Sequence, residues 1–417
     1  LVIGRGGREH ALVWMLSKSK QISKIYVAPG NDGMKEYAEL VHIDENDFEA
    51  LASYVIQEKI AYTIVGPEIP LDNGIVDYFT QKDLKIFGPT AAASKIESSK
   101  IFAKTLMHKY NIPTASFFIA ETYDSAVKFI QEQPEKSFVV KADGLAAGKG
   151  VIVSATVEEA KNAVDLIMKD KAFGNAGDRV VIEEFLKGEE ASFIAFTDGK
   201  TVLPLPTSQD HKAIYEGDKG PNTGGMGAYS PAPVVTEEIA EYVMDKIMLP
   251  TVRGLAAEGR PYKGMLYAGL MIEDNRVNVL EFNCRFGDPE AQPLLMRLKS
   301  DIVDVFDAAI DGTLEDVEMK IDPRPTICVV MASGGYPGAY EGGKQIKGLT
   351  KAAAIPGVEV FHAGTARVKN RIATAGGRVL GITAVGKDLQ TAIDRAYKAT
   401  AEITWTKCYY RKDIGSK

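Results

Sequence analysis

Short runs of β-branched and other apolar residues alternate with helical patterns through the first hundred residues. The runs lie at 1–3, 25–28, 62–65 and 85–87 and are typical of buried strands. Between the second and third runs, apolar residues recur at helical spacing, at Phe48, Leu51, Ala52, Val55 and Ile56. Strands separated by helices predict a doubly wound parallel sheet with helices over both faces.

The pattern predicts two domains in the first half of the chain. A helix over 94–110 ends before Pro113, where proline restricts the preceding residue and starts a new segment, so an N-terminal α/β domain is expected at 1–113. Strands at 138–142, 151–153 and 180–184, with a helix at 156–169, then predict a small α+β lobe at 114–190.

Two further domains are expected in the second half. A central lobe at 191–322 carries long loops, a helix from about Thr236, strands at 266–272 and 277–283, and a helix after Pro289. Loops of that length inside a compact domain are usually functional. A proline-containing linker then leads into a C-terminal α+β domain at 323–417, with strands at 327–332, 358–362 and 378–383 and a helix at 389–403.

Composition excludes several classes of protein. The 417 residues are 45% apolar and 25% charged, as in ordinary globular proteins, and the net charge of −7 argues against a nucleic-acid-binding protein. Cys284, Cys328 and Cys408 lie far apart, which argues against a disulfide framework or zinc site and favours a reducing compartment. No apolar run reaches the roughly 20 residues of a membrane span, and no signal-peptide pattern is present, so we expect a cytoplasmic protein without membrane contacts. Because Leu1 already lies in an expected strand, we expect residues to precede it.

Two glycine-rich turns are candidate phosphate-binding segments. The first, GRGGREH at 4–10, follows a strand and opens a helix, where backbone N–H groups favour an anion. The second, KADGLAAGKG at 141–150, adds two lysines to such a turn. A tight packing turn and an exposed hairpin, respectively, remain the alternatives. Neither segment has the spacing of a P-loop or of a dinucleotide fingerprint.

The segment EEFLKGEE at 183–190 leads from a strand into an acidic turn. An extended backbone can bind the edge of an adenine, and a carboxylate can accept hydrogen bonds from ribose hydroxyls, so the segment could form a nucleotide hinge. Taken alone, a solvated acidic turn explains the same residues.

The stretch EFNCRFGDPE at 281–290 is the most informative. Side chains alternate along a strand, so Glu281, Asn283 and Arg285 share a polar face, whereas Phe282, Cys284 and Phe286 face the core. A carboxylate and an amide oxygen two residues apart suit Mg²⁺, and an adjacent arginine can bind a phosphate or carboxylate with two N–H groups. A half-exposed strand with a surface ion pair is the alternative.

Two other segments carry weaker signals. His211, in SQDHK at 208–212, could act as an acid or base, but no nucleophile accompanies it in the sequence, so we interpret it as a loop residue. The loop NTGGMG at 222–227 allows a ligand to approach its backbone closely. An ordinary glycine-rich surface loop is the alternative.

In combination, these motifs resemble the ATP-grasp superfamily and, within it, the family of ligases that form glycinamide ribonucleotide. The resemblance covers nearly the whole chain. Its motifs are GRGGREHAL at 4–12, VAPGN at 27–31, IVGPE at 64–68, IFGPT at 86–90, KADGLAAGKGV at 141–151, EEFLKGEEASF at 183–193, SQDHK at 208–212, GPNTGGMGAYSP at 220–231, EFNCRFGDPE at 281–290 and RKDIG at 411–415. The resemblance implies an ATP-grasp fold, and a reaction of ATP, 5-phosphoribosylamine and glycine through a glycyl phosphate in purine synthesis.

The resemblance also implies residue roles. ATP, with Mg²⁺ or Mn²⁺, is expected to contact cofactor-binding residues at Lys100, Lys141, Gly144, Gly148, Lys149, Gly150, Glu183, Glu184, Leu186 and Glu190, and Glu281 and Asn283 are the expected metal ligands. The substrates are expected at Gly4, Gly6, Gly7, Glu68, Asp210, Asn222, Gly224, Gly225 and Arg285. Lys141, Asp210 and Arg285 are the expected catalytic residues. Arg5 departs from the small or amide residue more usual between the first glycines.

Other functions fit the motifs less well. Two other ATP-grasp ligases, the formate-using glycinamide ribonucleotide transformylase and the carboxyaminoimidazole ribonucleotide synthase, are the nearest alternatives, and SQDHK and GPNTGGMGAYSP weigh against them. A nicotinamide oxidoreductase lacks its fingerprint here. A non-catalytic nucleotide sensor is disfavoured because both lysines and both metal ligands are present. The expected partners are therefore small-molecule substrates, and no obligatory protein partner is evident.

Overall fold

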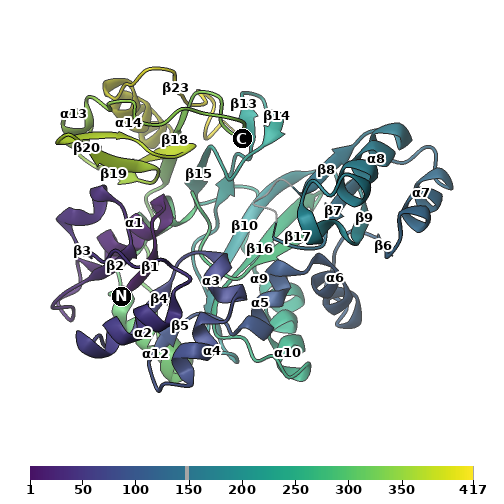
Figure 1. Cartoon of the computed structure of the whole chain (residues 1–417), viewed down its shortest axis with the longest axis horizontal. Helices are drawn as coiled ribbons and strands as arrows, with labels where there is room; N and C mark the ends of the chain where they lie inside the picture. The colour runs from purple at the N-terminus through teal and green to yellow at the C-terminus, as the bar shows by residue number, and fades with distance from the viewer. Residues whose placement is uncertain (146–149, 417) are drawn as a thin grey trace.

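A five-stranded parallel sheet with the order β3-β2-β1-β4-β5 lies at the N-terminal end of the chain (Figure 1). The structure is a computed structural model, and it describes residues 1–145 and 150–416. The elements of this part are β1 Val2–Gly4, α1 Gly7–Leu16, β2 Tyr26–Pro29, β3 Glu39–Leu40, α2 Phe48–Gln57, β4 Thr63–Val65, α3 Glu68–Asp72, α4 Ile75–Thr80 and β5 Ile86–Phe87. The predicted parallel sheet is confirmed, with β3 as an additional edge strand.

Helix α2 buries most of the apolar face that its sequence predicts. Leu51, Ala52 and Val55 are buried, and the Asp47 side chain caps the helix by accepting a hydrogen bond from the amide of Ala50. Ile56 was expected on the same face but is 59% exposed. At 100° per residue, Ile56 lies at the rim of the apolar stripe, so it faces solvent.

The single helix expected over 94–110 is two helices, α5 Ala91–Ser98 and α6 Lys100–Lys109. The chain breaks at Ser99, which has an extended backbone and caps α6 by accepting from the amide of Phe102. Asp143 accepts hydrogen bonds from the Ser99 hydroxyl at 2.9 Å and from the Ile101 amide at 3.1 Å. The start of α6 is thereby joined to the glycine-rich turn that follows β7.

A four-stranded antiparallel sheet, in the order β6-β9-β7-β8, builds a small lobe that projects from the rest of the chain (Figure 1). Its elements are β6 Phe117–Ala120, α7 Tyr123–Gln131, β7 Phe138–Ala142, β8 Val151–Ser154, α8 Val157–Val164 and β9 Val180–Glu184. The lobe has a hydrophobic core of its own, with Ile130, Phe138 and Val164 at its centre.

The central part is built on a second four-stranded antiparallel sheet with the order β11-β10-β16-β17. Its elements are β10 Glu189–Thr197, β11 Val202–Pro204, β12 Gln209–Asp210, β13 Ala213–Tyr215, β14 Lys219–Asn222, β15 Gly227–Ser230, α9 Glu237–Val243, α10 Leu249–Ala257, β16 Gly264–Glu273, β17 Arg276–Asn283, α11 Ala291–Arg297 and α12 Ile302–Asp311. The two predicted strands at 266–272 and 277–283 correspond to β16 and β17, which pair with each other, and β17 forms one edge of the sheet.

The C-terminal sheet contains strands from two distant parts of the chain. Its path is β12-β15-β18-β22-β19, and β23 pairs with β18, so that two short strands of the 191–322 segment complete it. The C-terminal elements are β18 Thr326–Ser333, α13 Leu349–Ala353, β19 Val358–His362, β20 Thr365–Val368, β21 Arg371–Thr374, β22 Arg378–Val385, α14 Leu389–Glu402 and β23 Cys408–Tyr409. Within the two described ranges, 1–145 and 150–416, no helix has both the length and the apolar character needed to cross a membrane.

The glycine that starts α13 provides a test of the C-terminal packing. Gly348 has a φ of +87°, and an added Cβ would collide with the carbonyl oxygen of Glu402. Gly343 has a similar φ of +76° but open space around it. Gly343→Ala should therefore cost roughly 1 to 2 kcal/mol through backbone strain alone, whereas Gly348→Ala should cost roughly 3 kcal/mol or more. Urea unfolding measures both, and equal losses would show that the Glu402 backbone yields freely.

Candidate active site

The carboxylate of Glu281, near the end of β17, lies among positive charges from three parts of the chain. Burial alone would raise its pKa, but the charges of Lys212, Lys100 and Lys141 outweigh burial and lower the pKa to about 2. Glu281 is therefore ionised at neutral pH. An anionic oxygen surrounded by several cations is the environment that a polyphosphate and its metal ion need.

A buried ion cluster holds Lys141 in place. The two oxygens of Glu183 lie 2.9 Å from the Nζ atoms of Lys141 and Lys104, and all three side chains are almost fully buried. Lys141 also donates to the carbonyl oxygen of Leu280 at 3.0 Å, beside Glu281. Burial lowers the pKa of Lys104 to about 8, against the raising effect of Glu183. The cluster carries one excess positive charge next to the Glu281 carboxylate.

The predicted nucleotide hinge is positioned around this cluster. The Glu183 carboxylate is engaged by the two lysines, and the amide of Glu184 donates to the carbonyl of Ser116 at 3.0 Å. Leu186 is half-buried beyond the end of β9. The Glu183 side chain is therefore not available to bind an adenine base, and the backbone after Glu184 is the part of this segment that could bind it.

The glycine-rich turn after β7 is fixed at both described ends. Asp143 pairs with Arg179 at 2.8 Å, and the carbonyl of Gly150 accepts from the Ala142 amide at 2.9 Å. A Cβ on Gly144 would lie only 2.6 Å from the Cβ of Ala176, so this position requires glycine. The predicted phosphate contacts Gly148 and Lys149 lie outside the described residues.

Lys212 is a site residue that the sequence reasoning did not select. Its Nζ atom lies 2.9 Å from an oxygen of Glu190. Burial opposes its charge, but Glu190 and Asp210 raise its pKa well above the usual value. Lys212 belongs to the SQDHK motif, but Asp210 is the residue of that motif that was predicted in the site, and His211 was interpreted as a loop residue. Lys212 links the expected ribose carboxylate to the Glu281 cluster.

The glycine loop, NTGGMG at 222–227, is attached to the backbone of Lys212. Thr223 donates to the carbonyl oxygen of Lys212 from both its amide and its hydroxyl, each at 2.8 Å. Gly225 has a φ of +110° and packs against Pro289. Asn222 and Gly224 are exposed, whereas Asp210 is buried in β12.

Arg285 is held by two carboxylates from the N-terminal region. Its guanidinium lies 3.0 Å from Glu97 and 3.3 Å from Glu68, and Nη2 is 3.5 Å from Asn283 Oδ1. Burial acts against the charge of Glu68, but Arg285 and Arg8 lower its pKa to about 2. Glu97 was missed, because its partner lies 188 positions along the chain and no local motif marks it.

The predicted alternation along β17 extends beyond the end of the strand. Phe282, Cys284 and Phe286 are buried, as expected, and Glu281, Asn283 and Arg285 point to the other side. The amide and thiol of Cys284 both donate to Glu97 Oε2, at 2.7 and 2.9 Å. Burial and the Glu97 charge raise the pKa of this thiol well above its usual value, so it stays protonated.

The first glycine turn surrounds a carboxylate of the protein itself. Gly6 donates its amide to Glu9 Oε2 at 2.6 Å, and Glu9 pairs with Arg8. A Cβ on Gly7 would lie 3.6 Å from Asp288 Oδ1. Because Glu9 occupies an amide at the start of α1, the expectation that these amides bind phosphate is disfavoured at Gly6.

Arg378, from the C-terminal domain, links the first glycine turn, at 4–7, to the glycine loop at 222–227 through Asp288. Arg378 pairs with Asp288 at 2.9 Å and donates to the carbonyl oxygen of Gly224. Gly6, Gly7, Glu68, Gly224 and Gly225 lie around Asp288, Arg285 and Arg378, and Gly4 lies beside Glu9 and Pro67. Of the expected ATP residues, Lys100 and Lys141 lie around Glu281. The two groups meet at Asn283 and Arg285. Asn222, exposed on β14, joins neither group.

The residues at Glu281 fit a divalent ion in their chemistry. Among the described residues, no three acidic, histidine or cysteine side chains gather into a metal cluster. An ionised carboxylate and an amide oxygen on one face are hard ligands that suit Mg²⁺, which usually keeps phosphate oxygens and waters as its other ligands.

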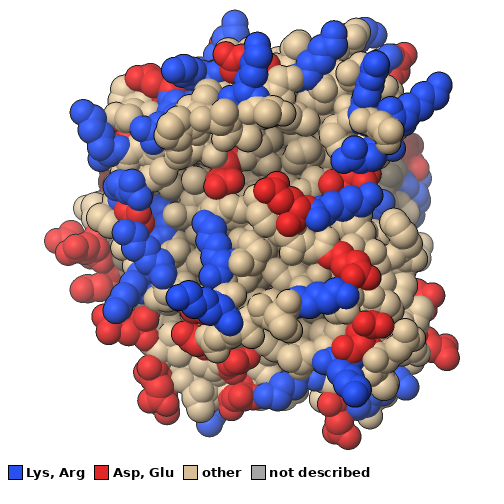
Figure 2. Space-filling model, turned by 90° about the vertical axis from the view of Figure 1, so that its left-hand side faces the viewer, with Lys and Arg blue, Asp and Glu red and all other residues tan. Residues whose placement is uncertain are grey.

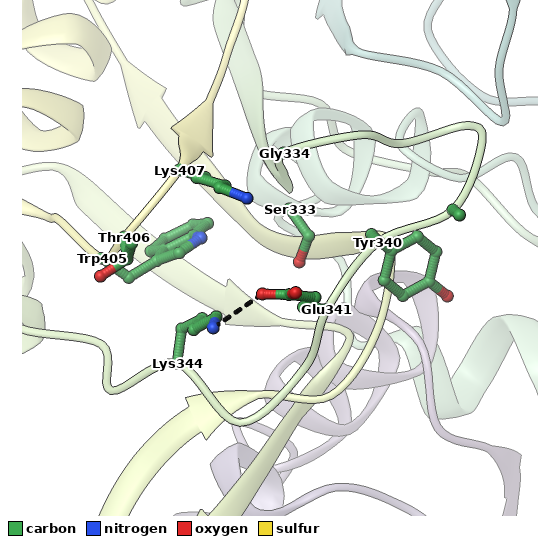
Figure 3. Close-up of a pocket in the computed structure, with 9 residues that line it drawn as sticks. Ser333, Gly334, Tyr340, Glu341, Lys344, Trp405, Thr406 and Lys407 are labelled. Atoms are coloured by element: carbon green, nitrogen blue, oxygen red, sulfur yellow. Dashed lines mark ion pairs between the residues drawn. The ribbon is translucent and has the colours of Figure 1, made fainter.

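A separate cavity of about 290 Å³ lies in the C-terminal domain (Figure 3). The Glu341–Lys344 ion pair, 2.9 Å long, crosses it, and Trp405 and Lys407 lie on its far wall. Among the described residues, none of those that the sequence predicts in the site lines this cavity. On the face seen in Figure 2, basic and acidic side chains are interspersed rather than gathered into one basic surface.

Comparison with known proteins bears on this geometry. Models of phosphoribosylglycinamide synthetase match in chain order: the N domain at 1–97, the ATP-grasp (A) domain at 98–291 and the C domain at 326–417. A phosphoribosylamine-glycine ligase from Pseudomonas aeruginosa is 52% identical over 418 aligned residues, which cover 100% of this chain and 97% of the relative.

Solved structures agree with the observed fold. The crystal structure of the phosphoribosylamine-glycine ligase from Thermotoga maritima is similar with a TM-score of 0.83 and 32% identity, over 99% of each chain. The biotin carboxylase domain of the Hydrogenobacter thermophilus 2-oxoglutarate carboxylase, solved with MgADP, has a TM-score of 0.74 at 15% identity, over 98% of this chain and 91% of that one. At that identity the likeness shows the fold alone. The agreement in sequence over the full length, together with the ATP-grasp fold, shows that this chain belongs to the family of phosphoribosylamine-glycine ligases.

Proposed function

We propose that this chain joins the carboxyl group of glycine to the amine of 5-phosphoribosylamine, with conversion of ATP to ADP and phosphate, through a glycyl phosphate. Family membership supports the reaction. The observation that carries the assignment of roles is the Glu281 carboxylate, which lies among the charges of Lys212, Lys100 and Lys141. ATP supplies the phosphoryl group that makes the glycine carboxylate an acyl donor.

The lysines neutralise the phosphates of ATP. Lys141 is fixed by Glu183 and the Leu280 carbonyl, and Lys212 is fixed by Glu190; the charges of both lysines act on Glu281. Such preorganised cations stabilise charge that develops during phosphoryl transfer without having to move. Glu190 accepts hydrogen bonds from the ribose hydroxyls, and the backbone around Glu184 and Leu186 binds the edge of the adenine.

Glu281 and Asn283 hold the divalent ion, for which we propose Mg²⁺ or Mn²⁺. The ion would supply charge neutralisation to the phosphates. The contribution of the chain is to keep Glu281 ionised: the surrounding lysines hold its pKa near 2, so protons do not compete for its oxygens at neutral pH.

Arg285 positions glycine. Glu97 and Glu68 bind its guanidinium on the side of α5 and α3, which fixes the plane of the fork. An oriented fork can bind the glycine carboxylate and then the acyl phosphate. Asp210 and the backbone of Gly224 and Gly225 complete this side of the site.

The acceptor amine approaches from the side of Gly4, Gly6, Gly7 and Glu68. The carboxylates of Glu9 and Asp288 lie at this turn, and they suit an amine and ribose hydroxyls better than a phosphate. The reaction requires no nucleophile from the enzyme, because the amine attacks the activated carboxyl group directly. A protonated, buried Cys284 agrees with this.

The small lobe at 114–190 covers ATP and excludes water during the reaction. We also propose that the enzyme acts in the cytoplasm on small molecules, without nucleic acid or an obligatory protein partner. The three cysteines, all within the described residues, are free thiols, in agreement with a reducing compartment. Incubation with ATP, glycine and 5-phosphoribosylamine tests the reaction: phosphate release must depend on glycine and on the amine.

Lys141 gives the first prediction. Lys141→Met should lower kcat about 10²- to 10³-fold, as for loss of one preorganised donor, yet the protein should fold because Glu183 keeps Lys104 as a partner. Lys104→Met is the matched control: it breaks the same cluster on the side away from Leu280 and should mainly lower the melting temperature. Steady-state kinetics and thermal unfolding decide, and similar turnover in the two variants would remove the assignment.

The metal ligands give the second prediction. Glu281→Gln removes the charged ligand, so the Mg²⁺ concentration for half-maximal activity should rise steeply, and Asn283→Ala should raise it less. Between pH 5 and 8 the parent's metal requirement should not change through Glu281. A carboxyl with its pKa lowered to about 2 loses its charge only near that pH. Mg²⁺ titrations that superimpose for both variants and the parent would show that neither residue is a ligand.

The neighbours Cys284 and Arg285 give the third. Cys284→Ala keeps the backbone bond to Glu97 and should cost at most about 1 to 2 kcal/mol of stability, with turnover retained. Arg285→Lys should impair turnover, because an ammonium cannot hold Glu97, Glu68 and glycine in one plane. Melting temperatures and glycine-dependent turnover are compared side by side; an inactive Cys284→Ala beside a fully active Arg285→Lys would reverse the two assignments.

A further inference from the structure

The RKDIG motif at 411–415 has no role in the proposed reaction, and yet its arginine is buried. Arg411 follows β23 and is 1% exposed. A guanidinium in the interior is costly unless its N–H groups are bonded. The partners of Arg411 therefore show what the motif does.

Arg411 joins the C-terminal tail to the β13–β14 hairpin. Nη1 donates to the Ala213 carbonyl and to Asp218 Oδ1, each at 2.9 Å. Nε and Nη2 donate to the two oxygens of Asp413, at 2.8 and 2.6 Å, and Asp413 in turn accepts from the amide of Gly217 at 2.8 Å. Arg411 and Asp413 thus hold the start of β13 and the turn between β13 and β14 at once.

The same tail contacts His211. Arg411 Nη2 lies 3.2 Å from His211 Nδ1, and the amide of Gly415 donates to His211 Nε2 at 3.1 Å. The His211 backbone is bonded to the start of β15. Its amide donates to the carbonyl oxygen of Gly227, and its carbonyl oxygen accepts from the amide of Met226. His211 is therefore fixed at both its side chain and its backbone.

His211 lies between Asp210 and Lys212, two residues of the proposed site. The segment held by the tail begins at His211, and the next residue, Lys212, pairs with Glu190 at 2.9 Å and faces Glu281. Displacement of the 211–218 backbone would move the Lys212 ammonium away from both carboxylates. The loop carrying Gly224 would move as well, since Thr223 is bonded to the Lys212 carbonyl.

We infer that Arg411 is a positioning residue for the reaction: together with Asp413 and Gly415 it fixes the 211–218 segment and so sets the place of Lys212 beside ATP. The inference deepens the proposed function and rests on the role given there to Lys212. It assigns the C-terminal tail to the nucleotide side of the site, although the tail belongs to the C-terminal domain.

The test compares kinetic constants with stability in the full chain. Arg411→Gln should raise the KM for ATP roughly 10-fold or more, as expected when a substrate-positioning group is displaced. Arg411→Lys should recover part of the lost melting temperature but keep a raised KM, because one ammonium cannot bond Asp413 and the hairpin together. Asp218→Asn, which removes the charge that Arg411 binds at 2.9 Å but leaves Asp413 bound, should show a smaller change in the same direction and remains informative if Arg411→Gln does not fold.

Arg395→Gln is the matched control. Arg395 donates to the Val385 carbonyl within the C-terminal domain, so its loss should lower the melting temperature and leave the KM for ATP unchanged. If Arg411→Lys and Asp218→Asn keep the parent KM while Lys212→Met raises it, the inference is wrong and the proposed function stands. If Lys212→Met also keeps the parent KM, the role of Lys212 and this inference fail together.

Discussion

The site depends on an unequal balance of buried charge. Two lysines, Lys104 and Lys141, share the single carboxylate of Glu183 in the interior, and the excess positive charge faces Glu281. Burying three charges is expensive, and such a cluster is stable only when each partner is well placed. Strand β9 supplies Glu183, β7 supplies Lys141 and α6 supplies Lys104, so the sheet order β6-β9-β7 is what brings them together. The proposed ATP site is therefore prepared before the nucleotide arrives, because the folded chain already holds these lysines.

Much of the fold could be predicted from the sequence because its elements are locally determined. The β-branched runs at the parallel strands, the apolar face of α2 and the alternation at 281–286 each reflect a period of the backbone. Deviations occurred where local rules are weakest. Ser99 divides one apparent helix in two because its hydroxyl caps the second helix and contacts Asp143, 44 positions away. The short strands β12 and β15 have too few residues to show any period.

The candidate site was predicted unevenly for a related reason. Residues within recognisable motifs, such as Lys141, Glu281 and Arg285, were selected, and the structure brings them close together. Glu97 and Arg378 were not, because their partners are distant in sequence: Glu97 binds Arg285 and Cys284, and Arg378 binds Asp288 and Gly224. The turn at 4–7 shows the opposite case. Its sequence made it a candidate phosphate-binding segment, but the Glu9 carboxylate accepts the hydrogen bond from the Gly6 amide that a phosphate would need.

The shared C-terminal sheet has a consequence for how the chain can be divided. Strand β18 pairs with β15 along one edge and with β22 along the other. A fragment starting at residue 323 would lack β12 and β15, so Thr326–Val329 of the apolar strand β18 would become an unpaired edge, and such edges recruit strands from other molecules. The C domain matched at 326–417 therefore lacks two strands of its own sheet. During synthesis, β15 stays without this sheet partner until β18, at 326–333, has left the ribosome.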